Sequence, residues 1–294
     1  MNRVFHYSES NNIYYNLALE EYFVRNFDFD RQELLLIYIN EPCIVLGKNQ
    51  NFFQEIHLSS FFESNYKLAR RISGGGTVVH DRGNINFAFF EKHQLKNVNN
   101  YDRSTGRLVE VLNELGIGTA MNDRNAILLS NGKKISGSAQ FSSSANILSH
   151  LTLLFDSDLD KIDTLIQKNP YALQTKASKS IRSTIDNIVN YTSLNQEEFI
   201  QECISKLGFD ANLTKEYIDV QAINRLILEK YGHQEYYFDT AATGMISIRG
   251  IEIEMVKGKI TNINGMKDSS MYIGKRLLPS EIPLDKSIWQ NLFH

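Results

Sequence analysis

The stretch that decides the fold is Arg70-Arg71-Ile72-Ser73-Gly74-Gly75-Gly76-Thr77-Val78-Val79-His80-Asp81. Three consecutive glycines add no packing, so a chain keeps them where its backbone must approach something closely or adopt angles that a Cβ forbids. The stretch predicts a strand, a tight turn with free N–H groups and a second strand. Such N–H groups form a concave anion site, and an arginine adds a planar fork suited to phosphate or carboxylate. A flexible, glycine-rich hairpin tip is the alternative.

A second motif follows further along the chain, Lys133-Lys134-Ile135-Ser136-Gly137-Ser138-Ala139-Gln140. It comes directly after Asn131-Gly132, which is a strong hairpin turn signal. Lys133 is expected to be a solvated surface lysine. Lys134 differs because the small residues that follow it leave room for a ligand beside the backbone, which makes Lys134 a candidate site residue.

Together the two stretches resemble the lipoate-protein ligase family, part of the wider group of biotin and lipoate ligases and octanoyltransferases. The family's catalytic lysine heads a Lys-(Ile/Val)-Ser/Ala-Gly motif, which falls here on Lys134. Further similarity occurs at Asn16-Leu17-Ala18 with Glu20-Glu21, at Gly47-Lys48-Asn49-Gln50-Asn51 and at Ser178-Lys179-Ser180-Ile181-Arg182-Ser183 ahead of Asn187. The resemblance therefore runs in order over most of residues 1–240. The family's Arg-Arg, Ser-Gly-Gly-Gly, His-Asp and Gly-Asn motif is matched at Arg70, Arg71, Ser73, Gly74, Gly75, Gly76, His80, Asp81, Gly83 and Asn84.

The resemblance implies an adenylate-forming enzyme that activates lipoate with ATP and passes the lipoyl group to a lysine of a lipoyl-domain protein. Acyltransferase subunits of 2-oxoacid dehydrogenases and the glycine cleavage H protein are the implied acceptors. Mg²⁺ is expected with the triphosphate, although no ligands for it are assigned. The implied catalytic residues are Lys134 and Arg71, and lipoate would contact Lys134, Gly75, His80 and His150. The implied ATP- and lipoyl-adenylate-binding residues are Arg71, Ser73, Gly74, Gly75, Gly76, Thr77, Val78, Val79, His80, Asn84, Asn125, Lys134 and Gly137.

Two departures from the family pattern keep alternatives open. Ala126 stands where the family commonly has an aspartate, and Leu151 where a glycine is usual. Ala126 motivates a transferase that uses preformed lipoyl-adenylate. An octanoyltransferase with an acyl-cysteine would need a cysteine near the site, but Cys43 and Cys203 lie among apolar residues, are expected to be buried, and do not fall where such relatives place theirs. A non-catalytic lipoyl-binding module is the most distant alternative.

The composition describes an ordinary globular protein of 294 residues with 42% hydrophobic residues. Its net charge of −3 gives no reason to expect nucleic acid binding. No signal-peptide core and no apolar run of membrane-spanning length occur in the sequence. We therefore expect a soluble, cytoplasmic protein without a membrane or nucleic acid partner.

The predicted fold is α+β, with a biotin/lipoate ligase-like, class II synthetase-like core in which helices flank a mixed, largely antiparallel sheet. Residues 1–239 are expected to form the catalytic domain and residues 240–294 a small accessory domain with a three-stranded meander and a helical tail. Residues 34–46 predict a hairpin, and residues 14–26 and 53–65 predict helices. Glu20 and Glu21 are expected to be solvated helix charges.

Overall fold

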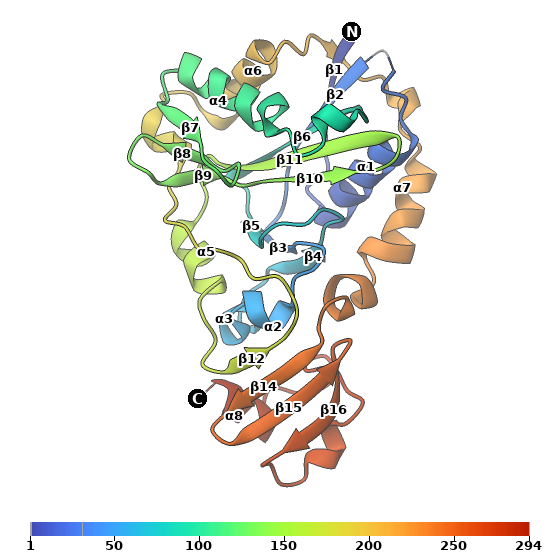
Figure 1. Cartoon of the computed structure of the whole chain (residues 1–294), viewed down its shortest axis with the longest axis vertical. Coiled ribbons are helices and arrows are strands. Elements are labelled where there is room, and N and C mark those ends of the chain that lie inside the picture. Colours follow the sequence, from blue (N-terminus) through green and yellow to red (C-terminus); the bar gives the residue numbers. More distant parts are fainter. Residues whose placement is uncertain (1, 31, 294) are drawn as a thin grey trace.

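The computed structural model describes residues 2–30 and 32–293 (Figure 1). Its largest sheet has the order β10-β11-β6-β2-β1-β13. The strands pair antiparallel from β10 to β2, whereas β1 pairs parallel with β2 and β13. The sheet is therefore mixed and largely antiparallel, as predicted. Its strands are β1 (Asn2–Tyr7), β2 (Gln32–Ile39), β6 (Asn84–Lys92), β10 (Ser138–Ser142), β11 (Asn146–Leu154) and β13 (Ala211–Asn212).

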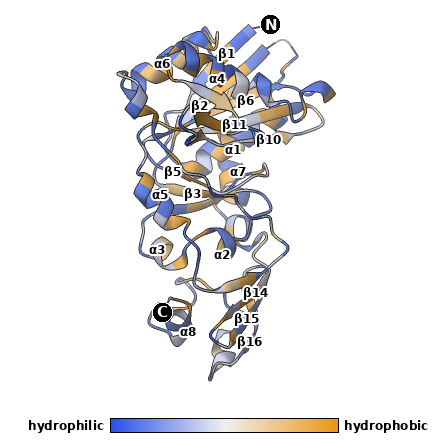
Figure 2. Ribbon diagram, turned by 60° about the vertical axis from the view of Figure 1, so that its left-hand side comes forward, coloured by the Kyte–Doolittle hydropathy of each residue, from blue (hydrophilic) through white to orange (hydrophobic). Residues whose placement is uncertain are grey.

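Helices cover both faces of this sheet because its central strands are apolar on both sides (Figure 2). Along β2, Leu34 and Leu36 pack into one hydrophobic cluster and Leu35 and Ile37 into another, as the alternation of side chains along a strand requires. The first cluster includes side chains of α1 (Ile13–Asn26) and α7 (Val220–Leu226), and the second those of α4 (Thr105–Glu114) and α6 (Gln196–Lys206).

A three-stranded sheet of order β4-β3-β5 lies below the large sheet and carries the glycine-rich stretch. Its strands are β3 (Cys43–Leu46), β4 (Lys67–Arg70) and β5 (Val78–His80). The predicted hairpin over residues 34–46 is wrong, because β3 pairs with β4 and β5 while β2 stays in the large sheet. The glycine turn therefore links two strands that lie on opposite edges of β3.

The Lys134 motif begins in another small sheet, formed by β7 (Thr119–Met121), β8 (Ile127–Leu129) and β9 (Lys134–Ser136). Its β8–β9 hairpin turns at the predicted Asn131-Gly132 position, where Gly132 has a φ of +81°. Gly137 separates β9 from β10. The motif thus crosses from the small sheet into the large one.

The predicted helix over residues 53–65 is instead two short helices, α2 (Phe52–Glu55) and α3 (Leu58–Phe62). The chain between them docks on the region of α5 (Leu159–Leu165). The amide of His57 donates to the carbonyl of Leu165 at 2.9 Å, and the amide of Leu58 donates to the Asn169 side chain at 3.0 Å. These non-local bonds interrupt the helical ladder.

The C-terminal part contains the predicted meander of β14 (Gly244–Ile248), β15 (Ile251–Val256) and β16 (Lys259–Asn264), followed by the tail helix α8 (Ser287–Phe293). A fourth strand, β12 (Ala172–Gln174), joins this sheet from the preceding part of the chain. One hydrophobic cluster also joins the meander to α2, α3 and α5. The division at residues 239 and 240 stays a prediction.

Short 3₁₀ turns and two π-helical turns connect these elements. The 3₁₀ turns are Leu95–Asn97, Tyr101–Arg103, Ile188–Tyr191, Lys215–Tyr217 and Ser269–Tyr272, and the π-helical turns are Ile227–Tyr231 and Glu235–Asp239. Among the described residues, no helix combines the length and apolar character needed to cross a membrane.

Candidate active site

The glycine turn between β4 and β5 is closely packed, and its backbone needs a glycine. Gly75 has a φ of +87°, and a Cβ there would lie 2.9 Å from Nη2 of Arg71. Gly47 lies against the same turn, since a Cβ on it would lie 2.2 Å from the Gly75 carbonyl oxygen. Both predicted reasons for the glycines, close approach and backbone angle, are therefore present.

The Arg71 side chain holds this turn by hydrogen bonds to its backbone carbonyls. Its Nη2 donates to the carbonyls of Gly74 and Gly76 at 2.6 and 2.7 Å, and its Nε donates to Oγ of Ser73 at 3.0 Å. Because the C=O and the following N–H of a trans peptide point in opposite directions, Arg71 turns the amides of Gly75 and Thr77 outward. Burial lowers the pKa of Arg71 to about 10, so the guanidinium is still charged at neutral pH.

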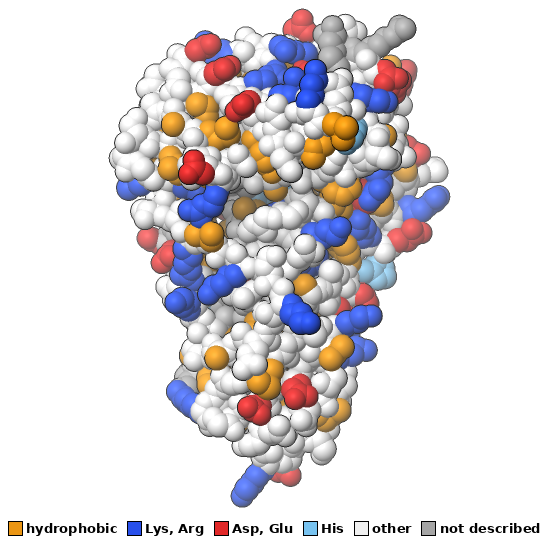
Figure 3. All heavy atoms as spheres, in the orientation of Figure 1, with side chains coloured by type: hydrophobic (Ala, Val, Ile, Leu, Met, Phe, Trp, Pro, Cys, Tyr) orange, Lys and Arg blue, Asp and Glu red, His pale blue; other side chains and the backbone are white. Residues whose placement is uncertain are grey.

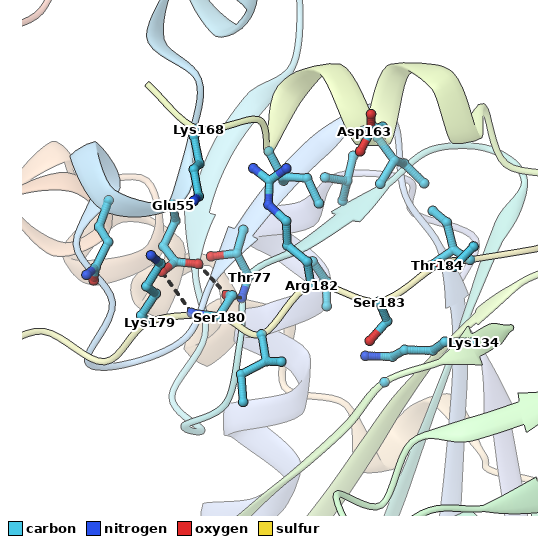
Figure 4. Close-up of a pocket in the computed structure, with 18 of the residues that line it drawn as sticks. Glu55, Thr77, Lys134, Asp163, Lys168, Lys179, Ser180, Arg182, Ser183 and Thr184 are labelled. Carbon is cyan, nitrogen blue, oxygen red and sulfur yellow. Dashed lines mark hydrogen bonds between the residues drawn. The ribbon is translucent and has the colours of Figure 1, made fainter. Parts of the chain in front are cut away.

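The segment from Ser178 to Ser183 docks on the outward side of the turn (Figure 4). The hydroxyl oxygen of Ser180 accepts hydrogen bonds from the Thr77 amide at 2.9 Å and from Nε2 of Gln50 at 2.8 Å. Both the amide and the hydroxyl of Ser180 donate to the Glu55 carboxylate. The Gly47–Asn51 loop and the basic segment, both of which carry the family resemblance, therefore meet at the glycine turn.

Lys134 begins β9 and is held through its backbone. Its amide donates to the carbonyl of Thr184 at 2.8 Å, and its carbonyl accepts from the amide of Asp186 at 3.1 Å. A Cβ on Gly137 would lie 3.2 Å from Nζ of Lys134, so the small residue leaves room for the lysine side chain itself. Burial, followed by the charges of Arg124 and Arg71, lowers the pKa of Lys134. Its ammonium group has no hydrogen bond or ion pair with the part of the chain that the structure describes.

Two cavities meet at Lys134. The smaller has a volume of about 360 Å³ and lies behind the glycine turn, with Leu17, Tyr38 and Val45 among its lining residues. The larger has a volume of about 980 Å³ and lies in front, between β5, α5 and the segment around Ser180 (Figure 4). Lys168, Lys179 and Arg182 line the larger cavity. Lys and Arg side chains also gather over the middle of this face of the molecule (Figure 3).

Two buried histidines line the smaller cavity. Nδ1 of His80 accepts from the side-chain amide of Asn40 at 2.9 Å, since the oxygen of that amide already accepts from Asn16. The His80 proton therefore lies on Nε2, which has no partner among the described residues and is available to a ligand. Burial lowers the pKa of His80 to about 3. His150, on β11, contacts both Ser73 and Glu20.

The structure brings most of the predicted site residues together. The smaller cavity is lined by Arg71, Gly75, Gly76, Thr77, Val78, His80, Lys134, Gly137 and His150, and Val79 lines the larger one. Four others lie outside both walls: Ser73, Gly74, Asn84 and Asn125. Asn125 has a φ of +59° beside Ala126, which does line the smaller cavity. The binding roles of all these residues stay predictions.

Some residues at the site were missed or misjudged from the sequence. The expectation that Glu20 and Glu21 are solvated is wrong, because both carboxylates are buried. The sequence does contain a signal that Glu20 is buried. Leu17, Glu20 and Val24 follow the i, i+3, i+7 spacing of one helix face of α1. A carboxylate on an apolar stripe indicates a buried partner. Lys168 carries no local signal, since it reaches the larger cavity only through the packing of α5.

No group of three or more His, Cys, Asp or Glu side chains that could hold a metal ion occurs in residues 2–30 and 32–293. Glu55 and Asp163 are the carboxylates that line the larger cavity. Both cysteines are buried, as predicted, and neither lines a cavity.

Comparisons with known proteins agree on one family. A family model described as the lipoyl protein ligase A/B catalytic domain matches residues 12–208. The chain is 35% identical over 234 residues to the lipoate-protein ligase LplJ of Bacillus subtilis, covering 76% of this chain and 69% of that protein.

Two solved structures share the fold. The structure of lipoate-protein ligase A bound with ATP aligns with a TM-score of 0.69 at 21% identity, covering 82% of this chain and 100% of that one. The putative lipoate protein ligase Ta0514 of T. acidophilum, with bound lipoic acid, aligns with a TM-score of 0.68 at 21% identity, covering 81% and 99%. The predicted fold class is thereby confirmed, and the chain belongs to the lipoyl protein ligase A/B catalytic domain family.

Proposed function

We propose that this chain is an ATP-dependent lipoate-protein ligase with its reaction centre at Lys134. The observation that carries the proposal is the position of the Lys134 ammonium, partly buried and without a partner among the described residues, where two cavities meet. A cation at that junction can contact the carboxylate of an acid in one cavity and the α-phosphate of a nucleotide in the other. Such a contact stabilises the charge that develops as the two react.

Each cavity suits one substrate. The smaller is walled by apolar side chains at Leu17 and Val45 and has polar groups where it meets Lys134, which suits an acyl chain ending in a carboxylate. The larger is lined by the basic side chains of Lys168 and Arg182, which suits a triphosphate. We assign lipoate to the smaller cavity and Mg·ATP to the larger.

The reaction proceeds in two steps. A carboxylate oxygen of lipoate attacks the α-phosphorus of ATP, the bond to the β-phosphate oxygen breaks, and pyrophosphate leaves. The amine of a lysine on a lipoyl-domain protein then attacks the acyl carbon, the bond to AMP breaks, and the amine loses a proton. Lys134 neutralises phosphate and acyl oxygens in both steps, and the walls of the site shield the adenylate from water.

Magnesium would arrive with the nucleotide. Mg²⁺ is commonly held by substrate phosphates and one or two carboxylates, and Glu55 and Asp163 are the carboxylates placed to contribute. Acyltransferase subunits of 2-oxoacid dehydrogenases and the glycine cleavage H protein are the proposed acceptors.

The test is lipoate-dependent exchange of labelled pyrophosphate into ATP, with lipoylation of a lipoyl domain followed in parallel. We expect exchange only when lipoate and magnesium are both present. A protein that shows no exchange, yet lipoylates the acceptor from supplied lipoyl-adenylate, is the transferase instead.

Ala126 is the observation that favours this second function, because it lines the smaller cavity where relatives commonly carry a carboxylate. The Ala126→Asp variant therefore accompanies the exchange assay across a magnesium titration. If exchange rises only in that variant, the natural chain has lost activation and the transferase is correct.

A further inference from the structure

A chain of buried hydrogen bonds links helix α1 to the glycine turn. The Glu20 carboxylate lies 2.9 Å from Nδ1 of His150, and Nε2 of His150 lies 2.7 Å from Oγ of Ser73. The Ser73 oxygen in turn accepts from Nε of Arg71 at 3.0 Å. Tyr38 donates its hydroxyl to the other Glu20 oxygen at 2.9 Å. These residues come from helix α1, strands β2 and β11 and the turn itself.

One assignment of protons satisfies every contact in the chain. A carboxylate accepts, so His150 donates from Nδ1, and in the neutral imidazole Nε2 then carries a lone pair. The hydroxyl of Ser73 donates to that lone pair while its oxygen accepts from Arg71. Every bond points the same way, from the guanidinium of Arg71 to the carboxylate of Glu20. This chain of Arg71, Ser73, His150 and Glu20, here called the relay, therefore connects a buried positive charge to a buried negative charge.

Charge balance explains why Glu20 is present on an apolar helix face. Arg71 is 6% exposed and Glu20 is 1% exposed, and an isolated buried ion is strongly unfavourable unless it is paired and hydrogen-bonded. Burial lowers the pKa of Arg71, and the negative charge of Glu20 is the first effect that opposes this. Two other groups near the relay, His80 on β5 and Lys134 on β9, carry no negative charge to replace it.

The same contacts resemble a Glu-His-Ser triad, but the geometry excludes a nucleophilic role for the serine in this arrangement. Ser73 is 1% exposed and does not line either cavity. Its oxygen accepts one strong donor and its proton is directed at His150. The action of the relay must therefore pass through Arg71, whose other N–H groups hold the carbonyls of Gly74 and Gly76.

We infer that Glu20 is a positioning residue for the adenylation step, which acts through His150 and Ser73 to hold Arg71 and thereby fix the backbone of the glycine turn with the Gly75 amide facing outward. The inference rests on the proposed function for its kinetic readout. Misplacement of reacting groups by about 1 Å can cost about 100-fold in rate. The side chain has to act at a distance, since Glu20 itself lines neither cavity.

The test compares Glu20→Gln with Glu21→Gln. Glu21 is the matched control, because it is the adjacent buried carboxylate on the same helix but bonds to Arg25, Lys230 and Tyr231, away from the turn. We expect Glu20→Gln to lower kcat for lipoate-dependent pyrophosphate exchange about 10- to 100-fold. Its KM for ATP should change by less than about threefold, since the basic residues of the larger cavity remain. Glu21→Gln, measured below its own Tm, should keep kcat within about twofold.

A double-mutant cycle separates a relay from general destabilisation. If Glu20 acts through Ser73, then Ser73→Ala should remove little further activity from the Glu20→Gln protein, whereas independent effects multiply. Multiplying losses, or an equal loss in Glu21→Gln, would overturn the inference. Should Glu20→Gln not fold, His150→Asn takes its place in the cycle, because asparagine can still donate to Glu20 but cannot reach Ser73.

Hydrogen exchange gives a readout that does not depend on the reaction. Amide hydrogens in the peptide covering residues 71–77 should exchange faster in Glu20→Gln than in the natural chain. In Glu21→Gln their exchange rate should not change. If the natural chain shows no lipoate-dependent exchange of pyrophosphate, the proposed function fails while this measurement still decides the relay. If the natural chain is active and the peptide is equally protected in both variants, the relay is wrong and the function stands.

Discussion

The two cavities that meet at Lys134 are built in different ways. The inner wall of the smaller one is regular structure: helix α1, the strands β2 and β11 of the large sheet, and a glycine turn held by Arg71. The exposed segment around Ser180 lines both cavities, but the basic side chains of Lys168 and Arg182 line only the larger one. A packed wall fixes shape, whereas exposed cations supply charge without a fixed shape. The comparison suggests that selection of the acid is rigid and that the nucleotide is held by a more adaptable surface.

Lys134, which lines both cavities, gives the largest expected effect. Lys134→Ala should lower lipoylation of a lipoyl domain by at least ~100-fold, because it removes the central cation from both cavities. The matched control is Lys133→Ala. The Lys133 side chain is half-exposed, pairs with Asp186 at 2.9 Å and lines neither cavity. Mass spectrometry of the acceptor measures both variants, and near-normal turnover in Lys134→Ala would reject the assignment.

The glycine turn tests the rigid cavity by itself. Gly75→Val should weaken lipoate binding by about 10- to 100-fold, because a side chain at a φ of +87° is strained and its Cβ would displace Arg71. Gly74→Ala is the control, since a Cβ there meets no atom within 4 Å. Calorimetric titration with lipoate measures both. If Gly75→Val unfolds at a much lower temperature while its folded fraction binds lipoate normally, the turn is only structural.

A substitution in the larger cavity should weaken ATP binding and leave lipoate binding unchanged. Arg182→Ala should raise KM for ATP by about 5- to 10-fold through the loss of one charge-assisted phosphate contact, while lipoate affinity stays unchanged, because Arg182 lines only the larger cavity. Steady-state kinetics with each substrate varied separately measure the effect. A change in lipoate affinity of similar size would show that the two cavities are not independent.

The sequence located the two local motifs better than it predicted which strands pair. The glycine turn and the Lys134 hairpin are local motifs, so their chemistry can be identified without knowing their neighbours. The pairing of β3 with β4 and β5, and of β12 with β14, joins distant segments, and a short apolar run does not specify its partner. The local hairpin rule therefore placed residues 34–46 in one sheet when they belong to two.

The buried charges show a second limit of local reasoning. Glu20 was misjudged because carboxylates on helices are usually solvated, and its partner His150 comes from a strand far along the chain. Arg71 was predicted as a fork for phosphate or carboxylate, yet its hydrogen bonds hold Ser73, Val45 and the carbonyls of the glycine turn. A guanidinium motif indicates an anion site but does not specify whether the arginine contacts the anion or builds the backbone that does.

The smallest expected effect concerns the cysteines, and it separates a ligase from an acyl-cysteine transferase. Both thiols are buried in hydrophobic clusters away from the cavities, Cys43 on β3 and Cys203 on α6. Burial raises the pKa of Cys203 to about 12 and raises the pKa of Cys43 as well, so neither forms the thiolate that nucleophilic attack requires. The Cys43→Ala, Cys203→Ala protein should keep lipoylation activity within about twofold per folded molecule, because no step passes through sulfur.

Each small void costs about 1 kcal/mol of stability, so activity is measured well below the Tm and scaled to the folded fraction. Mass spectrometry of the natural chain after incubation with octanoyl or lipoyl donors completes the test. A thioester on either cysteine would require an acyl-enzyme route, with a covalent intermediate in the smaller cavity.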